Sequence, residues 1–260
     1  MLRPISELKH LKLRASDGDF GHVKEIFFDD TSWMTRYLVA DTGGWLSGRQ
    51  VLISPFALRP VDELDRVLPV NLTKKQIEDS PLSDTDEPLS RQFEDDYYDY
   101  YGWPGNWSGG ADLGAAPYLG PGVALAAARA EDHASQLNEQ VGVGTLPRVA
   151  HDPRLRSSAD TTGHHLHASD GDIGHVVDFL VDDVTWKIGF IIAATTNWWP
   201  GKKVLISPRW IRDLDWSESR VVITATRAQV QAVPEYRDQK HVTADHEAEL
   251  HRHFELPGLF

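Results

Sequence analysis

Short apolar segments alternate with turn dipeptides over the first 72 residues of the chain. Asp17-Gly18 and Gly43-Gly44 are two of these turns, and both dipeptide types tolerate the positive φ angles of tight turns. The pattern predicts six short strands, at residues 9–15, 23–28, 33–42, 49–54, 57–62 and 66–72. The connections are shorter than a parallel crossover requires, so we expect a mainly antiparallel sheet. Six short, twisted strands bury most apolar surface by closing into a small barrel.

Two short helices are predicted after these strands. Thr73 precedes residues 74–78 and is a typical N-cap residue. A second helix is predicted to begin near Ser90, where Glu94 in the first turn faces the positive end of the helix dipole. Aromatic residues recur on this helix at i, i+4, i+7 and i+8, which predicts one continuous stripe. They are Phe93, Tyr97, Tyr100 and Tyr101.

The same pattern occurs twice in the chain. ASDGDFGHV begins at Ala15 and recurs as ASDGDIGHV at Ala168, and VLISP recurs at the same offset of 153 residues. Without any gap, 25 of the 67 residue pairs that begin at Ala15 and Ala168 are identical, whereas chance pairing gives about four. The chain therefore contains two copies of one unit, each about 95–105 residues long.

These observations predict a mainly β protein with short helices, built as two small six-stranded antiparallel β-barrels that are each followed by helical extensions. We expect the first repeat at residues 1–107, a linker rich in Gly, Ala and Pro at 108–159, and the second repeat at 160–260. Isologous contacts are the commonest association of identical folds, so the two repeats are expected to pair about a pseudo-twofold axis. The expected inter-repeat packing residues are Phe93, Tyr97, Tyr100, Tyr101, Leu250 and Phe254.

Composition excludes several classes of function. The chain has no Cys, which excludes disulfides and thiolate metal sites and fits a reducing compartment. Its net charge of −13 makes it a poor ligand for phosphate backbones, so no nucleic acid is expected as a partner. No apolar segment is long enough to be a transmembrane span. We therefore expect a cytoplasmic protein, with peripheral membrane association left open.

The segment LRASDGDFGHVKEIFFDDTSWMTRYLVADTGGWLSGRQVLISP, which begins at Leu13, resembles the PRC-barrel family. That family is named for the cytoplasmic domain of the photosynthetic reaction centre H subunit and includes the C-terminal barrel of the ribosome maturation factor. The resemblance covers residues 1–81 and 160–234, and the helical extensions EDDYYDYYGWPGNW and HEAELHRHFELPGLF resemble those of tandem bacterial members. It implies a six-stranded β-barrel that serves assembly and protein contact, and it implies no catalytic residues.

Aromatic residues at two predicted hairpin tips are the candidate partner-binding residues. Trp45 and Leu46 of the first repeat correspond to Trp198 and Trp199 of the second. Apolar side chains exposed at a hairpin end typically mark an interface. The alternative is that they close the mouth of the barrel, and the sequence leaves both interpretations open.

Histidines are concentrated in the second repeat. His165 and His167 alternate along a predicted strand and share one face, and His246 and His253 share one face of a predicted helix. Imidazole clusters bind Zn²⁺ or Ni²⁺, so these four residues form a candidate metal site. The first repeat has no histidine at the matching positions, so such a site would not belong to the shared design. Packed or solvated histidine is the alternative interpretation.

Other polar residues recur in both copies. Eight carboxylates lie at predicted turns, and we interpret them as turn residues because they lack the spacing of a calcium loop. They are Asp17, Asp19, Asp29, Asp30, Asp170, Asp172, Asp182 and Asp183. His22 and His175 also recur, and we interpret them as strand residues, although an imidazole also suits a proton-handling site.

The sequence contains no phosphate-binding loop, nucleophile elbow or HExxH motif, so we expect neither an enzyme nor a bound cofactor. The main prediction is a non-catalytic adaptor or assembly module that binds a protein, or a membrane-associated complex, through its barrel faces and hairpin tips. The first alternative is a metal- or small-ligand-responsive binding protein that uses the His-rich second repeat. The second alternative is a factor associated with the ribosome or with RNA processing.

Overall fold

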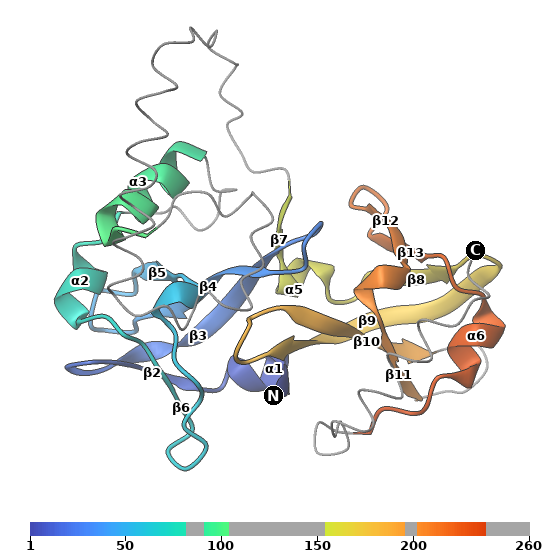
Figure 1. The fold of residues 1–260 in the computed structure, drawn as a ribbon, viewed down its shortest axis with the longest axis horizontal. Helices are drawn as coiled ribbons and strands as arrows, with labels where there is room; N and C mark the ends of the chain where they lie inside the picture. Colours follow the sequence, from blue (N-terminus) through green and yellow to red (C-terminus); the bar gives the residue numbers. More distant parts are fainter. Residues whose placement is uncertain (82–90, 104–153, 196–201, 238–260) are drawn as a thin grey trace, which may run out of the picture. The chain divides into compact units, whose positions relative to one another are not determined.

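The computed structural model describes residues 1–81, 91–103, 154–195 and 202–237 (Figure 1). The chain is mainly β, with a few short helices. The first repeat contains β1 (Leu2–Pro4), α1 (Ile5–Leu8), β2 (Lys12–Ala15), β3 (Gly18–Asp29), β4 (Thr35–Asp41), β5 (Gln50–Ile53), the 3₁₀ helix η1 (Pro55–Ala57), β6 (Val67–Pro69), α2 (Lys74–Glu78) and α3 (Arg91–Tyr101).

Elements of the second repeat follow in nearly the same order. They are β7 (Leu155–Ser157), α5 (Ser158–Thr161), β8 (His165–Ala168), β9 (Gly171–Asp182), β10 (Ile188–Thr195), β11 (Lys203–Ile206), the 3₁₀ helix η3 (Pro208–Trp210), β12 (Ile211–Asp215), β13 (Arg220–Ile223) and α6 (Arg227–Ala232). β7 and half of α5 lie in residues 108–159, the range that the sequence assigns to the linker. No described helix has the length and apolar character needed to cross a membrane.

Helices α2 and α6 begin at equivalent threonines. The Thr73 side chain accepts a hydrogen bond from the Gln76 backbone N–H, and the Gln76 side chain accepts one from the Thr73 N–H. Thr226 and Gln229 form the same capping box, which satisfies two N–H groups that a helix start leaves without partners. The predicted N-cap at Thr73 is confirmed, as is the predicted helix start near Ser90.

The strands form two sheets. One has six strands, with the order β5-β4-β3-β2-β6 and β7 added on β3, and the other has seven, with the order β11-β10-β9-β8-β13-β12 and β1 added on β9. β2 pairs in parallel with β6, and β8 pairs in parallel with β13. Both sheets are therefore mixed, and both end in separate edge strands, so neither is a closed barrel.

The prediction of closed antiparallel barrels is therefore wrong. A parallel pair needs a connection of a dozen or more residues, and the turns between consecutive strands are too short for this. The parallel pairs form instead between the second and last strands of a repeat, such as β8 and β13. The intervening strands themselves provide the long connection.

The first strand of each repeat pairs with the long strand of the other repeat. β1 is antiparallel to β9, with Leu2 opposite Asp182, and its equivalent β7 pairs with β3. The chain forms two compact units. Unit 1 comprises Met1–Leu11, Val23–Arg36 and Arg156–Phe260, and unit 2 comprises Lys12–His22 and Tyr37–Leu155. Unit 1 thus contains residues of both repeats.

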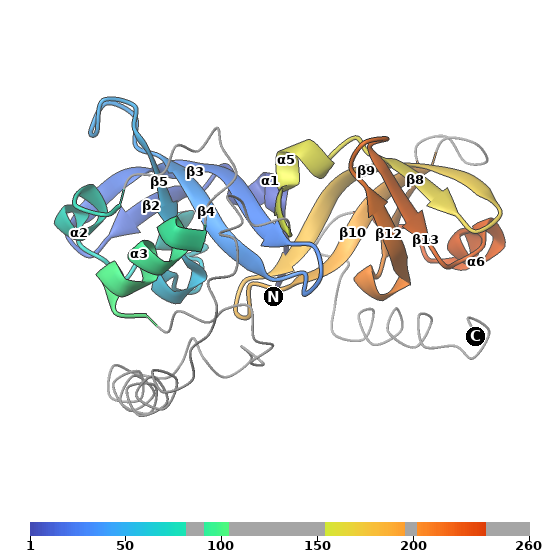
Figure 2. The ribbon, with the colours of Figure 1, turned by 90° about the horizontal axis from the view of Figure 1, so that it is seen from above.

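Each unit has its own apolar core. In unit 1, β9 and β10 run side by side (Figure 2), and their inward side chains, among them Phe179 and Phe190, are almost fully buried. In unit 2, the largest buried side chains are aromatic and come from β4 and α3, namely Tyr37, Tyr97 and Tyr98. Burial of side chains of this size is the main source of stability in small domains.

Candidate functional site

The carboxylates that recur in both repeats bind backbone and side-chain groups of the fold. Asp17 Oδ1 accepts a hydrogen bond from the Lys74 N–H at 2.8 Å, and Asp170 Oδ1 accepts one from the Arg227 N–H at 2.8 Å. These bonds tie the hairpin turns of β2–β3 and β8–β9 to the first residues of α2 and α6 (Figures 1 and 2). The two aspartates therefore position a helix in addition to forming a turn.

Asp29 and Asp182 close the turn that follows each long strand. Asp29 Oδ1 accepts from the Ser32 N–H, and Asp182 Oδ1 from the Thr185 N–H, each at 2.7 Å. The interpretation as turn residues is confirmed for these two. Trp33 and Trp186 follow in the left-handed region, with φ of 60° and 58°, a conformation that is unusual for bulky side chains.

Asp30 and Asp183 instead form ion pairs between the repeats. Arg3 Nε donates to Asp183 Oδ2 at 2.7 Å, and Arg156 Nε donates to Asp30 Oδ2 at 2.7 Å. At the offset of 153, Arg3 corresponds to Arg156 and Asp30 corresponds to Asp183. The same ion pair therefore occurs twice, with the roles of the two repeats exchanged. The first pair has side chains only 4% and 8% exposed, whereas the second has side chains 23% and 14% exposed.

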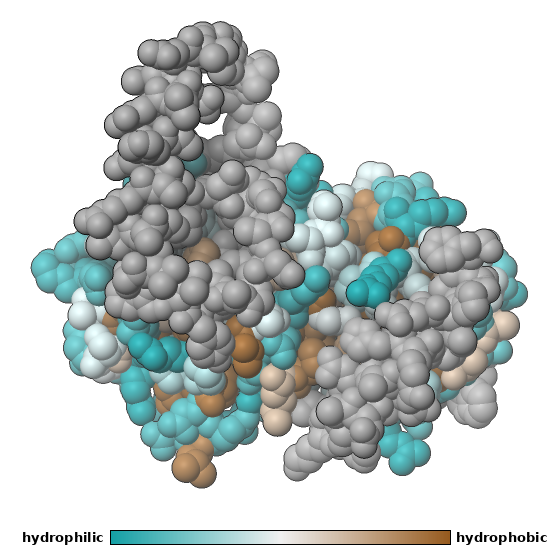
Figure 3. Space-filling view, viewed as in Figure 1, coloured by the Kyte–Doolittle hydropathy of each residue, from teal (hydrophilic) through white to brown (hydrophobic). Residues whose placement is uncertain are grey.

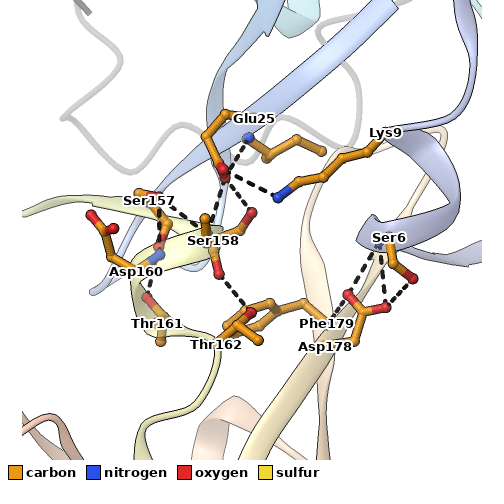
Figure 4. Close-up of polar contacts among 12 residues, drawn as sticks. Ser6, Lys9, Glu25, Ser157, Ser158, Asp160, Thr161, Thr162, Asp178 and Phe179 are labelled. Carbon is orange, nitrogen blue, oxygen red and sulfur yellow. Dashed lines mark hydrogen bonds and ion pairs between the residues drawn. The ribbon is translucent and has the colours of Figure 1, made fainter. Parts of the chain in front are cut away.

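A second reciprocal contact joins the two repeats (Figure 4). Glu25 Oε1 accepts from the Ser158 hydroxyl at 2.5 Å and from the Ala159 N–H at 3.1 Å. Its counterpart Asp178 accepts from the Ser6 hydroxyl at 2.5 Å. Each carboxylate thus binds the first turn of the short helix that belongs to the other repeat. Lys9 Nζ lies 3.1 Å from Glu25 Oε2 and balances its charge.

Backbone and aromatic contacts complete this region. The Thr35 N–H donates to the Trp186 carbonyl at 2.9 Å, and the Ile188 N–H donates to the Trp33 carbonyl at 2.8 Å. The ring centroids of Phe28 and Phe179 are 5.5 Å apart. We call these contacts the seam: residues 1–6 and 25–35 of the first repeat with residues 156–159 and 178–188 of the second. All of them belong to unit 1.

Sequence reasoning missed the arginines of the seam. The self-comparison started at Ala15 and Ala168, but the same offset also pairs Leu2 with Leu155 and Arg3 with Arg156. Extending the register toward the N-terminus would have shown an arginine recurring in both copies. It would not have shown which aspartate each arginine binds.

One end of the seam has aromatic and histidine neighbours that are absent from the first repeat. The Arg156 guanidinium lies 4.3 Å from the centroid of the Trp216 ring, a cation–π contact. His164 packs against the same ring at 5.3 Å, and its Nε2 is buried without a hydrogen-bond partner in the described part of the chain. Burial lowers the pKa of His164, with Asp160 opposing this and His165 adding to it. The equivalent of His164 in the first repeat is Leu11.

Replacing His164 with Leu should reduce the loss of stability on acidification. Burial makes protonation of the imidazole less favourable in the folded state than in the unfolded chain, where histidine takes up a proton near pH 6.5. The stabilisation is therefore complete above that pH and is lost as the pH falls below it, by at most about 1.4 kcal/mol per pH unit. Urea unfolding at pH 7.5 and 5.5 should show a smaller difference for His164→Leu than for the parent chain.

The first repeat provides the reciprocal control. Leu11 is buried at the equivalent position, so Leu11→His should cost more stability at pH 5.5 than at pH 7.5. Equal pH dependence of His164→Leu and the parent chain would contradict the role assigned to His164.

The structure describes half of the predicted metal ligands. His165 lies directly opposite His175 in the β8–β9 ladder, and His167 Nδ1 is 2.6 Å from Asp172 Oδ1. His246 and His253 lie outside the described residues. Within the described ranges, no three His, Asp or Glu side chains are grouped so that they could bind a metal ion.

Half of the predicted partner-binding residues are also described. Trp45 and Leu46 lie in the β4–β5 turn and are half-buried, and Trp198 and Trp199 lie outside the described residues. The Trp45 ring makes an edge contact with Phe20 at 6.0 Å, and Lys74 Nζ lies 4.5 Å from its centroid. Gly43 and Gly48 close the turn with φ of 54° and 79°. One face of Trp45 is thus packed, and part of the ring is accessible.

The aromatic stripe of α3 packs within the first repeat. The Tyr97 hydroxyl donates to the Leu52 carbonyl at 2.9 Å and accepts from the Ser54 N–H at 3.1 Å, and burial raises the pKa of the Tyr97 phenol well above its ordinary value. Tyr98, which the predicted stripe omits, is buried, whereas Tyr100 is 41% exposed. The buried described residues of α3 therefore follow i, i+3 and i+4 from Glu94.

Two other aromatic residues of the stripe pack against Tyr97. Phe93 stacks on Tyr97 with ring centroids 5.9 Å apart, and Tyr101 meets Tyr97 at 5.0 Å. Leu250 and Phe254 lie outside the described residues. A contact between this stripe and the second repeat stays a prediction.

The sequence matches no protein-family profile and no curated protein.

Proposed function

We propose that the chain is a non-catalytic adaptor or assembly module that binds a protein partner through an exposed surface next to the β4–β5 turn. The strongest support is that the polar residues found in both repeats make contacts within the fold. Asp17, Asp29 and Asp30, with their copies in the second repeat, all bind groups of the fold itself. The residues that both repeats share therefore stabilise the fold, and the surface of the fold is left to bind a partner. We place the module in a reducing compartment, in keeping with its lack of Cys.

The resemblance of the sequence to the PRC-barrel family supports the same proposal. That family serves assembly and protein contact, and its motifs occur in this chain twice and in the same order. The proposal rests on the framework and its surfaces and needs no closed barrel, because the two sheets here are open and mixed.

Trp45 is the described residue best suited to contact the partner. Tryptophan is enriched among the residues that dominate binding energy at interfaces. The ring of Trp45 is held by Phe20 and Lys74, so little side-chain freedom would be lost on binding. Lys74 also places a positive charge over the face of the ring.

Replacing Trp45 with Ser should weaken partner binding by about 2 kcal/mol or more, the size typical of an interface tryptophan. It should lower the stability of the isolated protein by only about 1–2 kcal/mol, since it removes one aromatic edge contact and one cation–π contact. Cross-linking in the native cell, followed by affinity measurements on the captured partner, tests the first effect, and urea unfolding tests the second.

Leu64 provides the matched control. It is 96% exposed on the loop before β6, whose tip is hydrophobic in the space-filling view (Figure 3). Leu64→Ser should leave both stability and partner affinity unchanged, because single exposed apolar residues are ordinary features of protein surfaces. Equal affinity of Trp45→Ser and the parent chain for the captured partner would exclude the β4–β5 turn as the binding surface.

The second candidate function is binding of a divalent transition metal ion by the second repeat. One observation favours it, the direct pairing of His165 with His175 across two antiparallel strands, since opposed imidazoles can share a metal ion. Thermal melts with and without Zn²⁺ distinguish the candidates. A rise in Tm that His175→Asn abolishes would favour metal binding, and an unchanged Tm would exclude it.

A further inference from the structure

The seam joins two surfaces that each repeat possesses in full. The first repeat supplies both an arginine, Arg3, and a receiving carboxylate, Asp30, and the second supplies Arg156 and Asp183. The same reciprocity holds for a backbone contact: the Ser6 N–H donates to Asp178, and the equivalent Ala159 N–H donates to the equivalent Glu25. Every contact in this set joins a residue of one repeat to a residue of the other.

Contacts that are repeated with exchanged roles define an isologous interface. In this chain the two repeats are covalently joined, but none of the seam contacts involves a residue of the segment that links them. The repeats are linked by residues 104–153 along the chain. A first repeat therefore meets the same chemical surface whether the second repeat comes from its own chain or from another.

We propose that the seam also accepts a second copy of this chain, so that two chains exchange repeats and form a dimer held by two seams. Each seam of the dimer contains both arginine–aspartate pairs, both carboxylate contacts with short helices, and the Phe28–Phe179 contact. The dimer makes no contact that the monomer lacks, so protein concentration decides between the two forms. The inference does not depend on the proposed function, because it concerns a second copy and not the partner at the β4–β5 turn.

Complementary charge variants of the full chain test the proposal. Arg3→Asp puts two carboxylates together in the seam of a monomer, and Asp183→Arg puts two guanidinium groups together. In an exchanged dimer made of one chain of each kind, one seam is unchanged and the other has the charges of residues 3 and 183 inverted, so residues 3 and 183 carry opposite charges in both seams. We expect each variant alone to form no dimer, and a mixture refolded from urea to form a 1:1 dimer, measured by native mass spectrometry.

The double variant Arg3→Asp/Asp183→Arg in a single chain is the matched control. It has the inverted pair within one molecule, so it should fold and remain largely monomeric at low concentration. If the double variant folds and the mixture of single variants gives no 1:1 dimer, the proposal is wrong.

A measurement on the unaltered protein covers the case in which the variants do not fold. Light and isotopically heavy chains are mixed in urea and refolded together at increasing concentration. Dimers of intermediate mass whose share rises with concentration support exchange of repeats. A product that is monomeric at every concentration overturns the proposal, and so do mixed-mass dimers that form equally well when the folded chains are mixed without urea.

Discussion

Replacing Gly174 with Ala should destabilise the protein by about 3 kcal/mol or more, since a buried group would be forced into space already filled. A Cβ at this position would lie 1.8 Å from the Ala194 carbonyl oxygen and 3.1 Å from Thr195 Cα. Both are backbone atoms of β10, the strand that pairs with β9 at this point. They cannot rotate away, so the two strands must separate or shift. Urea unfolding followed by circular dichroism measures the loss.

We expect a similar loss of stability at Gly21, the equivalent glycine of the first repeat. A Cβ on Gly21 would lie 2.1 Å from the Asp41 carbonyl oxygen, so Gly21→Ala should be as damaging. Gly44 is the control, because a Cβ there has no neighbour within 4 Å among the described residues. Gly44→Ala should change stability by less than about 1 kcal/mol. Similar losses for Gly44→Ala and Gly174→Ala would show that the close approach is not what requires glycine.

The DGDxGH motif recurs visibly in the sequence, but only part of its structural role could be predicted from it. Asp-Gly correctly indicates the turn. The motif could not indicate that Asp17 and Asp170 bind the starts of helices 57 residues further along the chain. Nor could it show that Gly21 and Gly174 lie against a passing carbonyl group. Both facts depend on contacts between distant segments, to which local propensity is insensitive.

Long-range pairing also explains the errors about the fold. Local alternation and turn residues were sufficient to place most strands and the cap at Thr73. They contain no information about the parallel pairing of β8 with β13, which joins strands about 50 residues apart. β1 has only three residues, too few for any periodicity, and it forms because β9 of the other repeat offers it a partner.

For the candidate site, the sequence indicated the right residue types and could not assign their partners. Asp30 and Asp183 resembled ordinary turn residues because they follow Asp29 and Asp182 directly. Only the meeting of the two repeats brings them to Arg156 and Arg3. The aromatic stripe on α3 shows the same limit: spacing alone selected Tyr100, whereas packing against β4 and η1 selects Tyr98.

Replacing Asp183 with Asn should cost about 3–5 kcal/mol, the usual result of removing one partner from a buried ion pair. Arg3 would keep its charge in a site where its side chain is only 4% exposed, and a neutral amide compensates a guanidinium far less than a carboxylate does. Asp30→Asn removes the equivalent carboxylate from a pair that is more exposed. Its cost should be smaller, about 1–2 kcal/mol, since solvent screens the remaining charge.

A double replacement separates two effects on the free energy of unfolding. One is the cost of removing the carboxylate from a buried arginine, and the other is the stability that the whole ion pair contributes. Arg3→Met/Asp183→Leu removes both charges and fills the space with apolar side chains, and such exchanges are often neutral or stabilising. We therefore expect the double variant to be more stable than Asp183→Asn, with urea midpoints at equal m-values as the measure. If the double variant is instead the less stable of the two, the ion pair contributes net stability to the seam. In that case, the buried charge pair stabilises the contact between the two repeats more than apolar side chains at the same two positions do.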